Sequence, residues 1–195
     1  MKLYSEYLKI RIYFDRDQKA EDLFFYLERY LDMATVQMQR MLDDEREMKI
    51  ACETTAIESL ERWISFSKHF CDIHFFILCV DKVFKLAKEL AQYLNNYELG
   101  GVITKYESLA VFKKMRNIFE HMDEKIMKTD WFRNNLSTMI NHTLTANGTS
   151  VFLGTDALEP LYSFYEEYLI VLNRILEPNK EQRDELWRIV AEQNK

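Results

Sequence analysis

Residues that break helices are scarce in this sequence: its 195 residues include only four glycines and two prolines. All-β domains need many turns between short strands, and glycine and proline are the usual turn residues, so this scarcity favours long helices. Long apolar runs are also missing, since the most apolar stretch, 70–80, contains Asp72 and His74. It is too short and too polar to span a bilayer. Residues 1–14 contain no apolar signal segment, so we expect a cytoplasmic protein without a membrane partner.

Cysteine is rare and irregularly placed, at positions 52, 71 and 79. The odd number and the lack of a CxxC or Cys/His pattern argue against a zinc site and a disulfide framework. We expect three buried, apolar cysteines in a reducing compartment, with Cys71 and Cys79 on nearly one helix face. No spacing of His, Asp and Glu predicts a metal, and no glycine-rich phosphate loop predicts a nucleotide cofactor. We therefore expect no cofactor.

Positive charge is in the minority, because the net charge is −6. This balance argues against broad, non-specific binding of nucleic acid, which needs many phosphate contacts from Lys and Arg. The window 105–116 is an exception: it contains four basic residues, Lys105, Lys113, Lys114 and Arg116, against Glu107 alone. A local basic site therefore remains compatible with the acidic chain.

The dominant pattern in the sequence is the helical periodicity of its hydrophobic residues. Hydrophobic residues make up 48% of the chain, which suffices for one domain spanning 1–195. Asp17 is an expected N-cap, and an apolar helical stripe follows it as far as Met41. The charge run 43–47 is expected to be a solvated helix end or turn. Residues 50–94 contain no glycine or proline, so they form either one very long helix or two helices with a tight bend near 65–68.

The second half of the chain mixes helices with one β signal. Asn95-Asn96 and Gly100-Gly101 are expected to end the long helical stretch, and a further helix is expected over about 104–128. Residues 138–145 alternate and are followed by Asn147-Gly148 and then 149–153, which predicts a β-hairpin. Helices over about 156–176 and 180–193 close the chain, and residues 3–13 fit either a strand or a short helix. The sequence thus predicts an all-α, up-and-down bundle of four to six helices with a small β-hairpin near 138–153.

One hexapeptide has the composition of a reactive site: Arg116-Asn117-Ile118-Phe119-Glu120-His121. Arginine is a permanent cation whose planar fork fits phosphate, and histidine exchanges protons near neutral pH. On an ideal helix, five residues turn about 140° beyond a full circle, so Arg116 and His121 would not share a face. They converge if Arg116 lies at a helix start or kink, if its side chain wraps around the helix, or if a second copy completes the cleft.

A purely structural interpretation of the hexapeptide remains open beside the chemical one. Arg116 and Glu120 are four residues apart and could form an ordinary ion pair, and His121 could pair with a neighbouring carboxylate. A similar pair, Arg62 and His69, is interpreted as structural. The other histidines carry weaker signals: His69 and His74 are expected in the core or at an interface, and His142 on the hairpin has no evident partner.

The segment 112–126 resembles the signature of the HEPN superfamily, which is Arg-x4–6-His, commonly with a polar residue directly after the arginine. Arg116, Asn117 and His121 match it. The resemblance implies a homodimeric helical bundle and a metal-independent endoribonuclease of toxin–antitoxin, defence or stress systems, although the superfamily also contains non-catalytic members. It implies that His121 is the general acid or base, that Arg116 stabilises phosphoryl charge, and that Asn117 orients the phosphate or His121. Other residues with an expected substrate-binding role are Lys113, Lys114 and Glu120.

One position departs from a known HEPN partnership. Some HEPN toxins have a tyrosine two residues after the histidine, where a partner nucleotidyltransferase modifies it, but this chain has Asp123 there. That partnership is therefore not expected, and any antitoxin or regulatory partner is unidentified. The sequence leaves three hypotheses: a metal-independent endoribonuclease acting on RNA, a non-catalytic module that binds nucleotide or RNA, and a helical protein-interaction module.

Overall fold

The computed structural model describes residues 3–15, 17–54, 59–121, 136–140, 142–146 and 148–193. The α-helices among them are α1 (Glu6–Ile10), α2 (Gln18–Thr54), α3 (Leu60–Tyr93), α4 (Tyr97–Lys105), α5 (Val111–Glu120) and α8 (Glu159–Gln193). Short 3-10 turns lie at Arg11–Phe14, Glu107–Ala110 and Thr155–Leu158. Strands β1 (Leu136–Ile140), β2 (Thr143–Ala146) and β3 (Thr149–Phe152) form one antiparallel sheet. The predicted all-α bundle with a small antiparallel β unit is confirmed.

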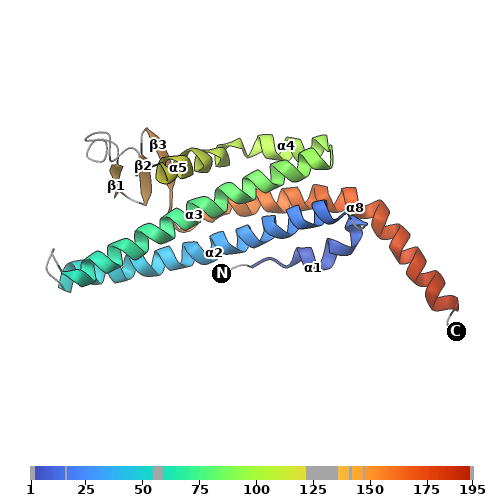
Figure 1. Cartoon of the computed structure of the whole chain (residues 1–195), viewed down its shortest axis with the longest axis horizontal. Helices are drawn as coiled ribbons and strands as arrows, with labels where there is room; N and C mark the ends of the chain where they lie inside the picture. Colours follow the sequence, from blue (N-terminus) through green and yellow to red (C-terminus); the bar gives the residue numbers. More distant parts are fainter. Residues whose placement is uncertain are drawn as a thin grey trace.

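Helices α2 and α3 pack along one another and form the spine of the molecule (Figure 1). The first part of α8 lies along this pair, whereas α4 and α5 follow one another along α3, with the sheet beside α5 (Figure 1). Chain termini lie apart, because the last part of α8 turns away from the bundle (Figure 1). This arrangement places α5, which carries the hexapeptide, on the outside of α3.

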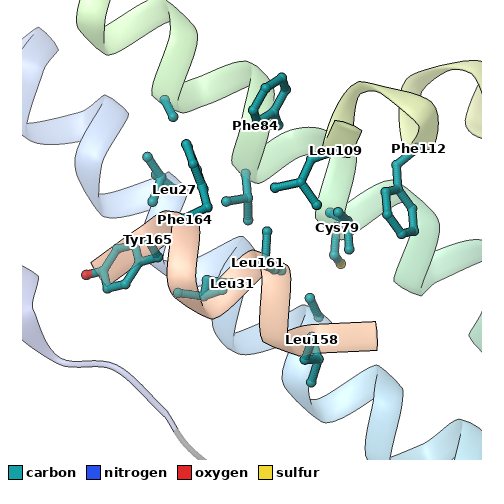
Figure 2. Close-up of a cluster of buried hydrophobic side chains, with 14 of the residues drawn as sticks. Leu27, Leu31, Cys79, Phe84, Leu109, Phe112, Leu158, Leu161, Phe164 and Tyr165 are labelled. Carbon is teal, nitrogen blue, oxygen red and sulfur yellow. The ribbon is translucent and has the colours of Figure 1, made fainter. Parts of the chain in front are cut away.

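The core lies where α2, α3 and α8 meet, and Figure 2 shows its apolar side chains pointing toward one another. Two tyrosines of α8 extend hydrogen bonds across this core. The Tyr165 hydroxyl donates to Glu28 Oε1 of α2 over 2.7 Å, and the Tyr168 hydroxyl donates to the Ala87 carbonyl of α3 over 2.8 Å. Buried hydroxyl groups need such partners, because an unsatisfied one costs about 1–3 kcal/mol. The two bonds fix how α8 lies against the spine.

Helix boundaries in the first half differ from the prediction. Asp17 caps α2 as expected, since its Oδ1 accepts the Ala20 N–H over 3.1 Å. The charge run 43–47 is not a helix end, because α2 continues to Thr54. Two of its ion pairs lie on the helix surface: Arg46 Nη1 lies 3.4 Å from Asp43 Oδ1, and Glu47 Oε2 lies 3.7 Å from Lys68 Nζ of α3. Ion pairs of this kind support an exposed helix face.

Residues 50–94 contain a break that neither predicted alternative placed correctly. Helix α3 begins at Leu60, where the Ser59 hydroxyl accepts the Arg62 N–H over 3.3 Å, and no bend occurs near 65–68. The cause is local, since serine is a favoured N-cap. Residues 3–13 adopt the helical alternative, as α1 and a 3-10 turn.

Helix α3 ends at Tyr93, so the stop signal predicted at Asn95-Asn96 is confirmed. The stop signal predicted at Gly100-Gly101 was wrong, because both glycines lie inside α4. Asn96 starts α4, because its Oδ1 accepts the N–H groups of Glu98 and Leu99, each over 3.0 Å. Two glycines cost a helix roughly 2 kcal/mol in total. Burial of Leu99 and Ile103, at 0% and 5% exposed, offsets that cost.

The segment expected as one helix over 104–128 is divided. The end of α4, a 3-10 turn and α5 occupy 104–120, and His121 follows α5 outside the helix. The remainder of that expectation, 122–128, lies outside the described residues.

The predicted hairpin is present as β2 and β3. Ala146 pairs with Thr149, and Gly148 adopts φ +71°, a value that an L side chain rarely tolerates. The expected first strand, 138–145, is however divided into β1 and β2, so the sheet has three strands. His142 marks the division with φ +59°, and its carbonyl accepts the Leu153 N–H over 2.7 Å.

Three smaller expectations have mixed outcomes. The chain ends in the single helix α8, with Pro178 inside it, rather than in two helices. Cys79 is buried as expected, but Cys52 and Cys71 are exposed; eight residues turn a helix about 80° beyond two full circles, enough to move Cys71 out of the core. His69 is buried as expected, and burial lowers its pKa.

None of the helices in the part of the chain that the structure describes has the length and apolar character of a membrane span.

Candidate functional site

The amphipathic pattern of α5 determines how the hexapeptide is presented. Four residues bury their side chains against the rest of the molecule: Phe112, Met115, Ile118 and Phe119. The same helix exposes Lys113, Lys114, Asn117 and Glu120. Phe119 anchors the end of α5, because its ring lies 5.3 Å from Phe70 and stacks on His74 at 5.4 Å. The polar face of α5 is therefore turned toward solvent.

Arg116 lies between the two faces of α5 and is held by two carboxylates. Its Nη1 pairs with Asp81 Oδ2 of α3, and its Nε lies 3.2 Å from Glu120 Oε2 one helical turn later. The guanidinium is 17% exposed and the Asp81 side chain 6% exposed, whereas Glu120 is 44% exposed. Arg116 thus has one buried anionic partner and one partner in contact with solvent.

Asn117 and His121 complete the group at the end of α5. Arg116 Nη2 donates to Asn117 Oδ1 over 2.9 Å, and the His121 N–H donates to the Asn117 carbonyl over 3.3 Å. His121 is exposed, with φ −107° and ψ 18°. The predicted alternative with Arg116 at a helix start is wrong, because Arg116 lies inside α5 and the chain leaves the helix at His121 instead.

The local charge of this site is less positive than the sequence window 105–116 indicated. Lys105 Nζ is bound to Glu167 Oε1 of α8 over 2.6 Å, and Arg116 is neutralised by Asp81. Lys113 and Lys114 are exposed and have no ion-pair partner among the described residues. These two lysines are the cations on α5 that remain available to an incoming anion.

Asp81 is the site residue that the sequence interpretation missed. It is 4% exposed and lies on α3 between buried Ile77 and Phe84, at helical spacing. A carboxylate is rarely buried without a partner. An acidic residue at a core position of an apolar helix was therefore the signal from which a buried cation partner could have been inferred.

Other parts of the molecule offer less chemistry. A shallow hollow where α3 meets α4 is lined by Lys88, Gln92, Asn95 and Tyr97, away from the hexapeptide. Among the residues that the structure describes, no group of three or more His, Cys, Asp and Glu side chains is arranged to hold a metal ion. His142, which has no evident partner in the sequence, has its Nδ1 3.5 Å from Glu45 Oε2 of α2.

Comparison with known proteins identifies no relative that has this arrangement of residues. No family model, no curated protein and no solved structure matches the chain. The resemblance to the HEPN signature therefore rests on the hexapeptide and its neighbours alone.

Proposed function

We propose that this chain is a HEPN-like, metal-independent endoribonuclease of a defence, stress or toxin–antitoxin system in the cytoplasm. The observation that carries the proposal is the hydrogen bond from the Arg116 guanidinium to the Asn117 amide, with His121 exposed one helical turn later at the end of α5. These are the groups that phosphodiester transfer requires when the protein supplies all the charge stabilisation.

In the proposed reaction, the ribose 2′-oxygen attacks the adjacent phosphorus and the bond from phosphorus to the 5′-oxygen breaks. His121 takes the 2′-hydroxyl proton or gives a proton to the leaving 5′-oxygen, and water carries out the other proton transfer. Arg116 stabilises the charge that develops on the phosphoryl oxygens, and Asn117 orients the phosphate or His121. Lys113 and Lys114 contact flanking phosphates. The products are a 2′,3′-cyclic phosphate and a 5′-hydroxyl.

The proposal includes a homodimer, in which a second copy completes the cleft. Large apolar side chains on α3 support this part, because Trp63, Phe66 and Phe75 are 62%, 54% and 52% exposed. The Trp63 and Phe66 rings lie 6.4 Å apart on one side of α3, whereas Phe75, nine residues after Phe66, lies about 180° around the helix from it. Phe75 adjoins His74, which stacks on Phe119 beside the site. The oligomeric state of Trp63→Glu by sedimentation tests this part, with a monomer as the expected result.

A non-catalytic, nucleotide- or RNA-binding module is the second candidate, and one observation favours it. Arg116 already has two carboxylate partners, so the cluster of Arg116, Asp81 and Glu120 has a net charge of −1. A cation in this state attracts phosphate weakly, and His121 would then only contact a ligand. A protein-interaction module, in which the cluster is purely structural, is the third.

The deciding experiment is RNA cleavage by the purified protein in excess EDTA, with analysis of the RNA ends. Wild type should cleave and leave cyclic phosphates, whereas His121→Ala should lose at least ~100-fold in rate. His142→Ala is the matched control, since it also removes a partly exposed histidine. Arg116 is tested together with Asp81, as Arg116→Gln with Asp81→Asn, so that no buried charge is left unpaired. If wild type binds RNA but neither it nor the variants cleave, the second candidate is favoured.

A further inference from the structure

Glu120 lies on the solvent-facing side of Arg116, where its Oε2 is 3.2 Å from Nε in an ion pair that lacks hydrogen-bond geometry. The two carboxylates on this guanidinium differ in access, because the Asp81 side chain is 6% exposed and Glu120 is 44% exposed. Asp81 comes from α3 and reaches Arg116 from within the molecule, whereas Glu120 reaches it along the surface of α5. An anion arriving from solvent can replace only the second.

Nothing in the local structure requires a carboxylate at position 120. Glu120 is the last residue of α5, where the negative end of the helix dipole disfavours another negative charge. An exposed i,i+4 ion pair contributes only about 0.3–0.5 kcal/mol, and Asp81 alone already balances the charge of Arg116. Stability of α5 therefore gains little from Glu120, while Glu120 changes the net charge of the cluster with Arg116 and Asp81 from 0 to −1.

We propose that Glu120 is an autoinhibitory phosphate mimic: it holds the solvent-facing side of Arg116 until a phosphate of RNA displaces it. This inference rests on the proposed function, and it names the regulation of the same site. It replaces the substrate-binding role that the sequence predicted for Glu120. Without RNA, the site is anionic because Glu120 covers Arg116. When a phosphate replaces Glu120, Arg116 contacts the reacting phosphate and Asp81 keeps Arg116 in place.

The test is Glu120→Gln, which keeps the shape of the side chain and removes its charge. Its control is Glu89→Gln on α3, because Glu89 also belongs to an i,i+4 pair, with Lys85 at 3.5 Å, and is also 44% exposed. Binding is measured by fluorescence anisotropy with a labelled, fully 2′-O-methylated oligonucleotide, which cannot be cleaved. Cleavage of the matching RNA is measured in EDTA.

Glu120→Gln should bind the oligonucleotide roughly three- to tenfold more tightly and cleave faster at subsaturating RNA. Glu89→Gln should bind like wild type. The gain should disappear in the background Asp81→Asn with Arg116→Gln, because Glu120 has no cation to block there. This double-mutant comparison separates a specific effect on Arg116 from a general change in charge.

Two contrary results have different meanings. If His121→Ala abolishes cleavage but Glu120→Gln binds and cleaves like wild type, or only as well as Glu89→Gln, the autoinhibitory role is wrong and the nuclease stands. If neither wild type nor Glu120→Gln binds or cleaves RNA at low salt, both proposals are wrong, because the variant exposes the guanidinium that each of them needs.

Discussion

Two arginine–aspartate pairs join α3 to its neighbours, and they differ in what surrounds them. Arg40 of α2 pairs with Asp72 over 3.1 Å, and Arg116 of α5 pairs with Asp81. Both aspartates are buried, with side chains 4% and 6% exposed, but Arg40 is 60% exposed and Arg116 only 17%. The charge of Arg40 is therefore hydrated by water, whereas that of Arg116 depends on its protein partners.

The anionic neighbours of the two pairs differ as well. Beside Asp72 lies a second aspartate, Asp44, and the extra negative charge falls on the acidic side of the pair. Beside Arg116 lies Glu120, and the extra negative charge falls on the cation. The first arrangement raises the pKa of Asp44, whereas in the second a carboxylate covers a cation. Only the second is placed beside an amide and an exposed histidine, which is why we assign function to it.

The largest expected effect is on stability, when the aspartate of each pair is neutralised. Asp81→Asn leaves Arg116 largely buried with only Glu120 to balance it, and should lower the free energy of unfolding by about 3 kcal/mol. Asp72→Asn leaves Arg40 in contact with water and removes the repulsion between Asp72 and Asp44. It should therefore lower the free energy of unfolding by about 1 kcal/mol or less. Urea denaturation measures both. Equal losses would show that the burial of the arginine does not separate the pairs.

The second effect is on activity, when each arginine is replaced by lysine. Arg116→Lys keeps the charge beside Asp81 but loses the planar fork that binds two phosphate oxygens, so cleavage in EDTA should fall at least ~10-fold while the fold persists. Arg40→Lys should cleave like wild type. A circular dichroism melt of both variants is the control for folding. Equal cleavage by both would remove Arg116 from the mechanism.

The third effect is a pH dependence of stability that arises from Asp44, beside the Arg40–Asp72 pair. Burial is the largest cause that raises the pKa of Asp44 to about 6, and the hydrogen bond and repulsion from Asp72 add to it. An unfolded aspartate titrates near ~4. The folded state binds this proton more tightly than the unfolded state. The resulting stability is complete below about pH 4 and is lost as the pH rises through about 6.

Asp44→Asn should therefore stabilise the protein at pH 7.5 by about 0.5–1 kcal/mol, a figure reduced for partial exposure, and should have little effect at pH 4. Asp43→Asn is the control, because Asp43 is exposed and pairs with Arg46 on the surface. Urea midpoints at several pH values decide the matter. A gain that is the same at every pH would mean that Asp44 does not hold the proton.

Local patterns predicted the helical class and the hairpin because their causes are local. Asp17 caps a helix wherever it precedes one, and Gly148 turns a hairpin because of its backbone freedom. The break before Leu60 has a local cause, the Ser59 N-cap, which the prediction missed. Another failure has a tertiary cause, since Gly100 and Gly101 stay helical because Leu99 and Ile103 are buried. Asp81 shows the same limit at the site. Its residue type was visible in the sequence, but its partner, 35 positions away, was not.

The smallest expected effect concerns the two exposed lysines of α5, which extend the Arg116 region and have no counterpart beside Arg40. If each contacts one RNA phosphate, Lys114→Gln should weaken oligonucleotide binding about two- to threefold and lower the slope of log K against log salt by about 0.7. Lys113→Gln should behave similarly. Lys85→Gln is the control, since Lys85 is an exposed lysine on α3 that pairs with Glu89. Binding titrations between 50 and 200 mM salt, roughly the range over which phosphate contacts dominate, give the slopes. Unchanged slopes in both α5 variants would confine the RNA contact to Arg116 and His121, and the basic face of α5 would then be an ordinary solvated surface.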